Sequence, residues 1–278
     1  MNSTAPIVVL PATGKTGSRV ADRLEALGLS VRRASRSSAT PFDWGDRSTW
    51  AAVLEGAQAA YIAYVPDISV PSAREDVAAL TELATELGVR RFVLLSGRNE
   101  ANALAVERAF GQAAETGSAT WSVVRASWFA QNFTEGAFAD GVRSGELALP
   151  VGDVPEPFVD VDDVADVVVV ALTSPGQHRV VHEVTGPTAL TFDEATARAG
   201  ARLVRVPLGG FSGALRDAGV PDVEIDLYAY LFSEILDGRN TQTTDAIERT
   251  LGRPPRSFDQ SVGARVAVTF AARRSSGE

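Results

Sequence analysis

The segment VVLPATGKTGSRV, residues 8–20, carries the clearest structural signal in the sequence. A short apolar run enters a turn rich in Thr and Gly, and an amphipathic helix follows. This order is typical of segments that hold the pyrophosphate of a dinucleotide against the N-terminus of a helix. Gly14 would let the backbone approach the phosphates, and Gly17 would let the helix pack closely. We therefore expect a binding loop formed by Thr13, Gly14, Lys15, Thr16 and Gly17.

Pro11 stands where such loops usually carry their first glycine. Proline has a fixed φ and no N–H group, so it costs little if that N–H is not needed. If the turn moves instead, dinucleotide binding weakens or fails. A plain structural turn is the alternative to a binding loop, because a glycine-rich turn alone is a weak signal.

The end of the second expected strand indicates which dinucleotide is bound. An NAD site usually places Asp or Glu there, whereas the segment VRRASRSS, residues 31–38, has three arginines and no acid. A guanidinium can donate two hydrogen bonds to a phosphate, so Arg36, with Ser35, Ser37 and Lys15, predicts NADP(H). A solvated arginine cluster explains Arg32 and Arg33 nearly as well.

Beyond this loop, short β-rich runs alternate with amphipathic stretches, which predicts a parallel sheet covered by helices. The expected strands are Ile7–Leu10, Ser30–Ala34, Ala59–Tyr64, Arg91–Leu95 and Trp121–Arg125. The expected helices are Ser18–Leu27, Ser48–Leu54, Ser72–Leu87 and Ala101–Glu115. Helix ends often carry a residue of positive φ, and we expect Gly28, Gly88 and Gly117 in that role. The fold class is α/β, a doubly wound parallel Rossmann sheet.

The alternation of expected strands and helices becomes less regular after residue 125. Expected helices dominate from Thr191 onward, including an aromatic one at residues 223–236. We predict a dinucleotide-binding core over 1–150 and a smaller, mostly helical substrate-binding part over 151–278. The segment VVHEVTG in that second part would add a last strand to the sheet. Residues 273–278 read as a disordered tail.

Composition limits the function. The 278 residues are 45% hydrophobic and carry a formal charge of −9, which argues against nucleic acid or an anionic membrane as a partner. The chain contains no cysteine, which fits a cytoplasmic protein, and Lys15 is its one lysine. No apolar run is long enough to span a bilayer. We expect a protein acting on a small hydrophobic or aromatic molecule, as a monomer or homodimer.

Several further segments together resemble a known family. They are PATGKTGSRVADRL, FDWGDRSTW, GVRRFVLLSGRNE, WSVVRASWFAQNF, PFVDVDDVADV, EVTGPTALTFDEA and DGRNTQTTDAIERTLGRPPRSF. The chain is similar to the NmrA-like branch of the atypical short-chain dehydrogenase/reductases. Within it, the chain most resembles the festuclavine synthase and agroclavine dehydrogenase subgroup of ergot-alkaloid reductases and its actinobacterial NAD(P)-binding relatives. The resemblance covers nearly the whole chain. It implies a Rossmann fold, NADP(H) and small-molecule reduction, although the wider family also includes NADP sensors without turnover.

The chain departs from ordinary short-chain dehydrogenases in one further respect. None of its four tyrosines is followed four residues later by lysine, so the usual acid for carbonyl reduction is absent. Hydride transfer to an iminium carbon yields a neutral amine and needs no proton donor. The resemblance to the alkaloid-reductase subgroup therefore leads us to expect this kind of reduction.

Three residues are candidates if a proton must move. Ser96 lies near the place of the catalytic serine of related enzymes, and capping of the following turn is its alternative role. Tyr64, at the end of the third expected strand, is explained better by packing. Asp160 could act if it faces the pocket, whereas Asp162 and Asp163 fit the N-terminus of a helix better than a metal site. His178 and His182 flank a β-like run and are too far apart for joint zinc ligation.

The ligand pocket is expected to be apolar. Trp128, Phe129 and Asn132 follow the fifth expected strand, and Tyr228 lies on the aromatic helix. We add Arg125, at the end of that strand, to the cofactor-binding residues. The sequence thus predicts an NAD(P)H-dependent reductase of a hydrophobic molecule, with an imine, iminium or conjugated alkene favoured over a ketone. A non-redox cyclase or isomerase on an altered Rossmann scaffold and an NADP-sensing binding protein are the alternatives.

Overall fold

The structure is a computed structural model that describes residues 5–263. By its internal contacts the chain forms two compact units, each assembled from three segments. Within the described range, unit 1 comprises residues 5–126, 162–184 and 246–252, and unit 2 comprises 127–161, 185–245 and 253–263. The division differs from the expected boundary at residue 150, because the chain leaves unit 1 after Ala126 and re-enters it at Asp162. The expected tail at 273–278 lies outside the described residues.

Unit 1 contains a six-stranded parallel sheet in the order β2-β1-β3-β4-β5-β7. Its strands are β1 (Ile7–Leu10), β2 (Val31–Arg33), β3 (Ala59–Ile62), β4 (Arg91–Gly97), β5 (Thr120–Ala126) and β7 (Val180–Val184). The strand order reverses direction between β1 and β3, the place where open α/β sheets bind ligands at their carboxyl ends. The doubly wound Rossmann sheet expected from the sequence is therefore confirmed.

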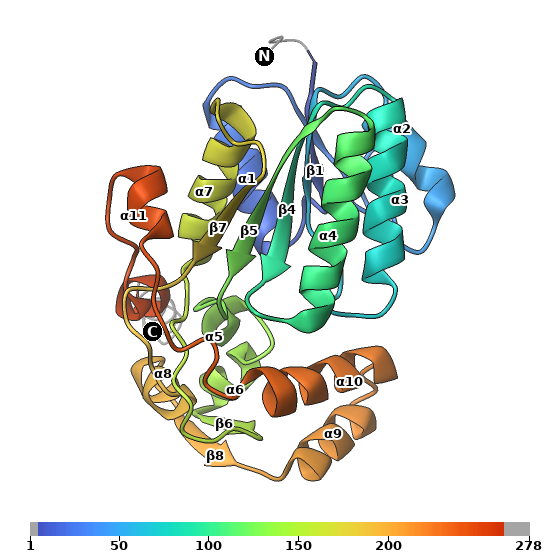
Figure 1. Ribbon diagram of the computed structural model, residues 1–278. Helices are drawn as coiled ribbons and strands as arrows, with labels where there is room; N and C mark the ends of the chain where they lie inside the picture. The colour runs from blue at the N-terminus through green and yellow to red at the C-terminus, as the bar shows by residue number, and fades with distance from the viewer. Residues whose placement is uncertain (1–4, 264–278) are drawn as a thin grey trace, which may run out of the picture. The chain divides into compact units, whose positions relative to one another are not determined.

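The helices of unit 1 cover both faces of this sheet. They are α1 (Lys15–Ala26), the 3₁₀ turn Arg47–Thr49, α2 (Trp50–Leu54), α3 (Ala73–Glu86), α4 (Ala101–Thr116), α7 (Val161–Thr173) and α11 (Ala246–Leu251). Figure 1 shows α1 and α7 on one side and α3 and α4 on the other. Arg23 of α1 pairs with Asp162 at 2.7 Å and with Asp166 at 2.5 Å, which joins α1 to α7.

One of the three expected helix-ending glycines has a different role. Gly28 and Gly88 adopt positive φ, at 73° and 96°, but Gly117 has φ −91° and Ser118 takes the left-handed conformation instead. A Cβ on Gly117 would lie 2.4 Å from the Cβ of Thr85 in α3. Glycine is required at this position because α3 and α4 approach each other closely, not because of its φ.

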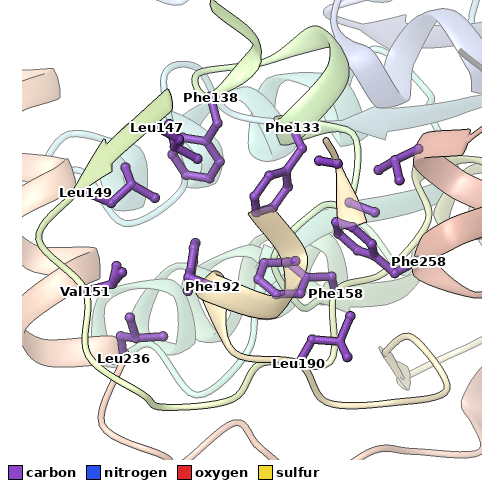
Figure 2. Close-up of a cluster of buried hydrophobic side chains, with 14 of the residues drawn as sticks. Phe133, Phe138, Leu147, Leu149, Val151, Phe158, Leu190, Phe192, Leu236 and Phe258 are labelled. Atoms are coloured by element: carbon purple, nitrogen blue, oxygen red, sulfur yellow. The ribbon is translucent and has the colours of Figure 1, made fainter. Parts of the chain in front are cut away.

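Unit 2 is a small α/β unit with an aromatic core. It contains α5 (Asn132–Glu135), α6 (Ala139–Ser144), β6 (Glu146–Leu149), α8 (Phe192–Arg198), β8 (Arg202–Arg205), α9 (Leu208–Asp217), α10 (Asp222–Tyr230) and a π-helical turn at Leu231–Ile235. Strands β6 and β8 form a parallel pair. Figure 2 shows the buried phenylalanines and aliphatic side chains of this core, among them Phe133, Phe158 and Phe192. No helix within the described range is long and apolar enough to cross a membrane.

Candidate functional site

The turn after β1 accommodates Pro11 by transferring a hydrogen bond to its neighbour. The N–H of Ala12 donates to the carbonyl oxygen of Ala34 at 2.8 Å, and the N–H of Ala63 donates to that of Leu10 at 2.7 Å. The turn therefore remains joined to both neighbouring strands without an N–H on residue 11. The Leu10–Pro11 peptide bond is cis.

Gly17 is required by the close approach of helix α1 to this turn. A Cβ on Gly17 would lie 2.0 Å from the carbonyl oxygen of Pro11, a distance that real side chains do not reach. A Cβ on Gly14 would have no neighbour nearer than 3.8 Å. Gly17 therefore serves packing, and Gly14 leaves room beside the backbone.

The N-terminus of α1 offers donors for an anion. Gly14 is its N-cap and supplies no side-chain acceptor, and no acidic residue lies in the first turn. The backbone N–H groups of a first helical turn have no partner within the helix, and the helix dipole favours negative charge there. Thr16 is buried and accepts a hydrogen bond from the Tyr61 hydroxyl at 2.8 Å, so its side chain faces the sheet. Thr13 is exposed, and Lys15 is half-buried.

The three arginines near β2 differ in their contacts. Arg32 donates to the carbonyl oxygens of Val53 and Glu55, both at 2.8 Å. Arg33 donates to Glu25 and Asp22. Arg36 is exposed and makes neither a hydrogen bond nor an ion pair with the described part of the chain. Its guanidinium remains available for an anionic ligand.

Ser35 lies beside Arg36 in the loop after β2. Its residue is 5% exposed, and its hydroxyl lies 3.4 Å from that of Ser37. The N-terminus of α1 follows β1, and Arg36, which has no partner among the described residues, follows the neighbouring strand β2. Together they form a donor set that suits a dinucleotide with an additional phosphate.

Ser96 and Arg125 belong to a network at the carboxyl end of the sheet. Ser96 on β4, Arg125 on β5 and Glu183 on β7 are register partners across three strands. The Ser96 hydroxyl donates to Glu107 of α4 at 2.6 Å. Arg125 donates to both carboxylate oxygens of Glu107 at 2.6–3.0 Å and to Glu183 at 3.0 Å. The hydrogen bonds to Glu107 raise the pKa of Arg125, so this arginine is fully charged and held by protein carboxylates.

Tyr64 lies two residues beyond β3, which ends at Ile62. Its hydroxyl donates to Asp76 at 2.7 Å and lies 3.0 Å from the Ser72 hydroxyl, while its ring packs on Trp44 with centroids 4.6 Å apart. Burial, together with Asp76, raises the pKa of Tyr64 to about 12. A phenol with this pKa is a weak acid at neutral pH, and its contacts are those of a packing residue.

Asp160 is buried immediately before α7 and accepts a hydrogen bond from Gln131 at 3.0 Å. The side-chain oxygen Oε1 of Gln131 accepts from the N–H of Val161 at 2.9 Å, so the Gln131 side-chain amide holds the start of the helix. Asp162 and Asp163 lie in the first turn of α7, the position that their helix-dipole interpretation predicted.

The expected substrate residues all lie in unit 2. Trp128 packs on Phe232 with centroids 5.5 Å apart, and Tyr228 packs on the same ring at 6.2 Å. Phe129 forms an isolated parallel bridge with Val159, and Asn132 begins α5. Trp128 and Tyr228 are both partly buried against the aromatic core, so each combines a packed side with an exposed one.

Neither histidine is part of a metal site in the described chain, where no group of three or more His, Cys, Asp or Glu side chains is arranged to hold an ion. His178 packs edge-on against Trp121, and His182 lies on β7 between Thr250 and Gln177.

Three acidic residues at hydrogen-bonded positions are not among the candidates predicted from the sequence: Glu107, Asp67 and Glu100. Glu107 lies on the buried face of α4, between Val106 and Phe110, and this charge in an apolar stretch was the available signal. Ser69 links the other two acidic residues: its N–H donates to Asp67 at 2.8 Å, and its hydroxyl donates to the buried Glu100. Burial raises the pKa of Asp67. Nothing local in the sequence indicates this second pairing.

Comparison with known proteins identifies relatives along the whole chain. No family model matches it. The chain is 30% identical over 276 residues to YesF of Bacillus subtilis, described as an uncharacterized oxidoreductase, covering 94% of this chain and 96% of that protein. It is 29% identical over 272 residues to agroclavine dehydrogenase of Claviceps fusiformis, covering 91% and 94%.

Among solved structures, the triphenylmethane reductase of Citrobacter sp. complexed with NADP(H) matches with a TM-score of 0.72 at 16% identity, covering 94% of this chain and 99% of that one. At this identity the match establishes a common fold.

Proposed function

Because the chain belongs to the NmrA-like branch of the atypical short-chain dehydrogenase/reductases, we propose that it is an NADP(H)-dependent reductase of a hydrophobic small molecule. One observation carries the cofactor assignment. Among the three arginines near β2, Arg36 has no partner in residues 5–263. It follows β2, the strand that pairs with β1, and the glycine turn follows β1. A guanidinium left without a carboxylate there suits the 2′-phosphate that distinguishes NADP from NAD.

The residues present fit this cofactor. The backbone from Thr13 to Gly17 would hold the pyrophosphate, and Arg36 with Ser35 would hold the 2′-phosphate. Bound NADPH would supply a hydride to an electrophilic carbon of the substrate. Arg125 is held by Glu107 and Glu183, so we assign it the role of fixing the carboxyl end of the sheet.

The contacts of the candidate acids support an imine or iminium over a ketone, and a conjugated alkene is the second substrate class that we propose. The hydroxyl hydrogen of Ser96 is donated to Glu107, and that of Tyr64 is donated to Asp76. Neither is directed at a carbonyl oxygen, and the chain lacks the Tyr-x-x-x-Lys pair. Reduction of an iminium requires no proton in the hydride step. We place Trp128, Phe129, Asn132 and Tyr228 on the substrate side.

Calorimetric titration with NADPH and NADH, with 2′-phospho-AMP as a competitor, tests the cofactor assignment. We expect tight binding that favours NADPH, and failure to bind either nucleotide would contradict it. The absorbance of NADPH during incubation with cyclic imines, enones and matched ketones then tests the reaction. Tight binding without oxidation of NADPH by any of them would favour the NADP-sensing alternative. A product of unchanged oxidation state formed without NADPH would favour the isomerase.

A further inference from the structure

The Ser96 hydroxyl has its single hydrogen committed to a protein acceptor. Ser96 is the second-last residue of β4 and is 4% exposed, and its Oγ donates to Oε1 of Glu107 at 2.6 Å. A hydroxyl carries one hydrogen and two lone pairs. What remains for a further contact is therefore acceptor capacity.

The direction of this hydrogen bond is fixed by Arg125. The guanidinium donates to both oxygens of Glu107, through Nε at 2.9 and 3.0 Å and through Nη2 at 2.6 Å. A carboxylate held in this way is ionised and has no hydrogen to give, so Ser96 must be the donor. Glu107 is 7% exposed, so little water reaches this hydrogen-bonded group.

We propose that Ser96 accepts a hydrogen bond from the N–H of a protonated imine and thereby selects substrates whose reacting nitrogen carries a hydrogen. This inference rests on the proposed imine reduction. Hydride adds to the carbon of C=N⁺–H, the π pair becomes the lone pair of nitrogen, and the N–H bond stays intact beside Ser96. The product is a neutral amine, and no proton is transferred. A ketone oxygen would face the lone pairs of Ser96 without a donor, so ketones are disfavoured.

Two matched substrates test the proposal. Protonated 3,4-dihydroisoquinoline carries an N–H, whereas N-methyl-3,4-dihydroisoquinolinium has the same ring and charge without it. For Ser96→Ala we expect kcat/KM to fall roughly 10- to 100-fold for the N–H substrate, the range for a hydrogen bond from a charged donor, and to stay unchanged for the N-methyl substrate. Ser96→Thr keeps the hydroxyl and should recover most of the loss.

Ser122→Ala is the matched control. Ser122 lies on the adjacent strand β5, is 1% exposed, and its hydroxyl has no hydrogen-bond partner in the described range. This variant should change neither substrate. Thermal melting and NADPH affinity establish whether Ser96→Ala is folded. Equal loss for both substrates, or loss for neither, would overturn the acceptor role.

A binding measurement separates failure of this inference from failure of the proposed function. Calorimetry with 1,2,3,4-tetrahydroisoquinolinium, an N–H donor, needs no turnover. If the native protein reduces neither imine, the proposed reaction fails, and the ammonium ligand then decides the role of Ser96. Binding weakened about tenfold or more in Ser96→Ala, and unchanged in Ser122→Ala, supports the acceptor role. Equal affinity in all three proteins overturns it.

Discussion

Replacing Glu107 by glutamine should destabilise the protein far more than an equivalent change at the surface. The substitution keeps the shape of the side chain but removes its charge and turns one acceptor into an NH₂ donor. Arg125 donates to both oxygens of Glu107 and Ser96 donates to one of them, so that group would face the guanidinium in either orientation and the Ser96 hydroxyl in one. At least one N–H or O–H donor would lose its acceptor whichever way the amide turned.

The magnitude follows from the burial of the pair. Removing one partner of a buried ion pair costs about 3–5 kcal/mol. The Arg125 side chain remains 20% exposed and keeps Glu183, which places the cost at the lower end. We expect Glu107→Gln to lower the free energy of unfolding by about 3 kcal/mol, roughly a 150-fold change in the unfolding equilibrium.

Glu25→Gln is the control, because Glu25 pairs with Arg33 at a site where the side chains are 47% and 36% exposed. An exposed pair of this kind contributes at most about 1 kcal/mol. Guanidinium titrations followed by circular dichroism measure both changes. The variants are compared with a common m-value, the slope of the unfolding free energy against denaturant concentration. A loss for Glu107→Gln no greater than that for Glu25→Gln would show that the Glu107–Arg125 pair contributes no more than an exposed pair.

Four further outcomes are expected. Arg36→Ala should weaken NADPH roughly 10- to 100-fold with little effect on NADH in calorimetry, and equal losses would remove its assignment to the 2′-phosphate. Gly17→Ala should lower both the melting temperature and NADPH affinity, because its Cβ would lie 2.0 Å from the Pro11 carbonyl oxygen, whereas Gly14→Ala should keep the melting temperature. Pro11→Gly should leave NADPH binding unchanged or improved, and a loss would mean that proline itself shapes the site. Burial lowers the pKa of His182 in the folded protein, so as the pH falls the unfolded chain takes up this proton at a higher pH than the folded protein does. The contribution of His182 to stability should be fully present above about pH 6.5 and be lost as the pH falls through the lowered folded-state pKa. Melting curves of His182→Gln should lack that component.

The sheet was predictable because its signals are local. Each expected strand of the core is a short apolar run followed by an amphipathic stretch, and the structure has a strand in each place. The errors arose where tertiary contacts decide. Gly117 follows a helix as the other two glycines do, yet Thr85, 32 positions earlier in the chain, accounts for it.

The candidate site was predictable in its residues but not in their partners. Arg36 and Arg33 look alike in the sequence, and only the fold brings Asp22 and Glu25 to Arg33. Likewise, Ser96 and Arg125 are unrelated candidates in the sequence. Their common partner Glu107 depends on the register of β4 against β5 and on the packing of α4, neither of which follows from one sequence.

The interleaving of the two units has a consequence for synthesis on the ribosome. The sheet of unit 1 receives its last strand, β7, only with residues 180–184, after the chain has supplied residues 127–161 to unit 2. Until then β5 is an open edge whose N–H and C=O groups can pair with another chain. A fragment ending at residue 150 would keep that edge permanently, so it should aggregate where the full chain does not. The protein must therefore be produced and engineered as one piece, since no single cut separates a complete sheet from the rest.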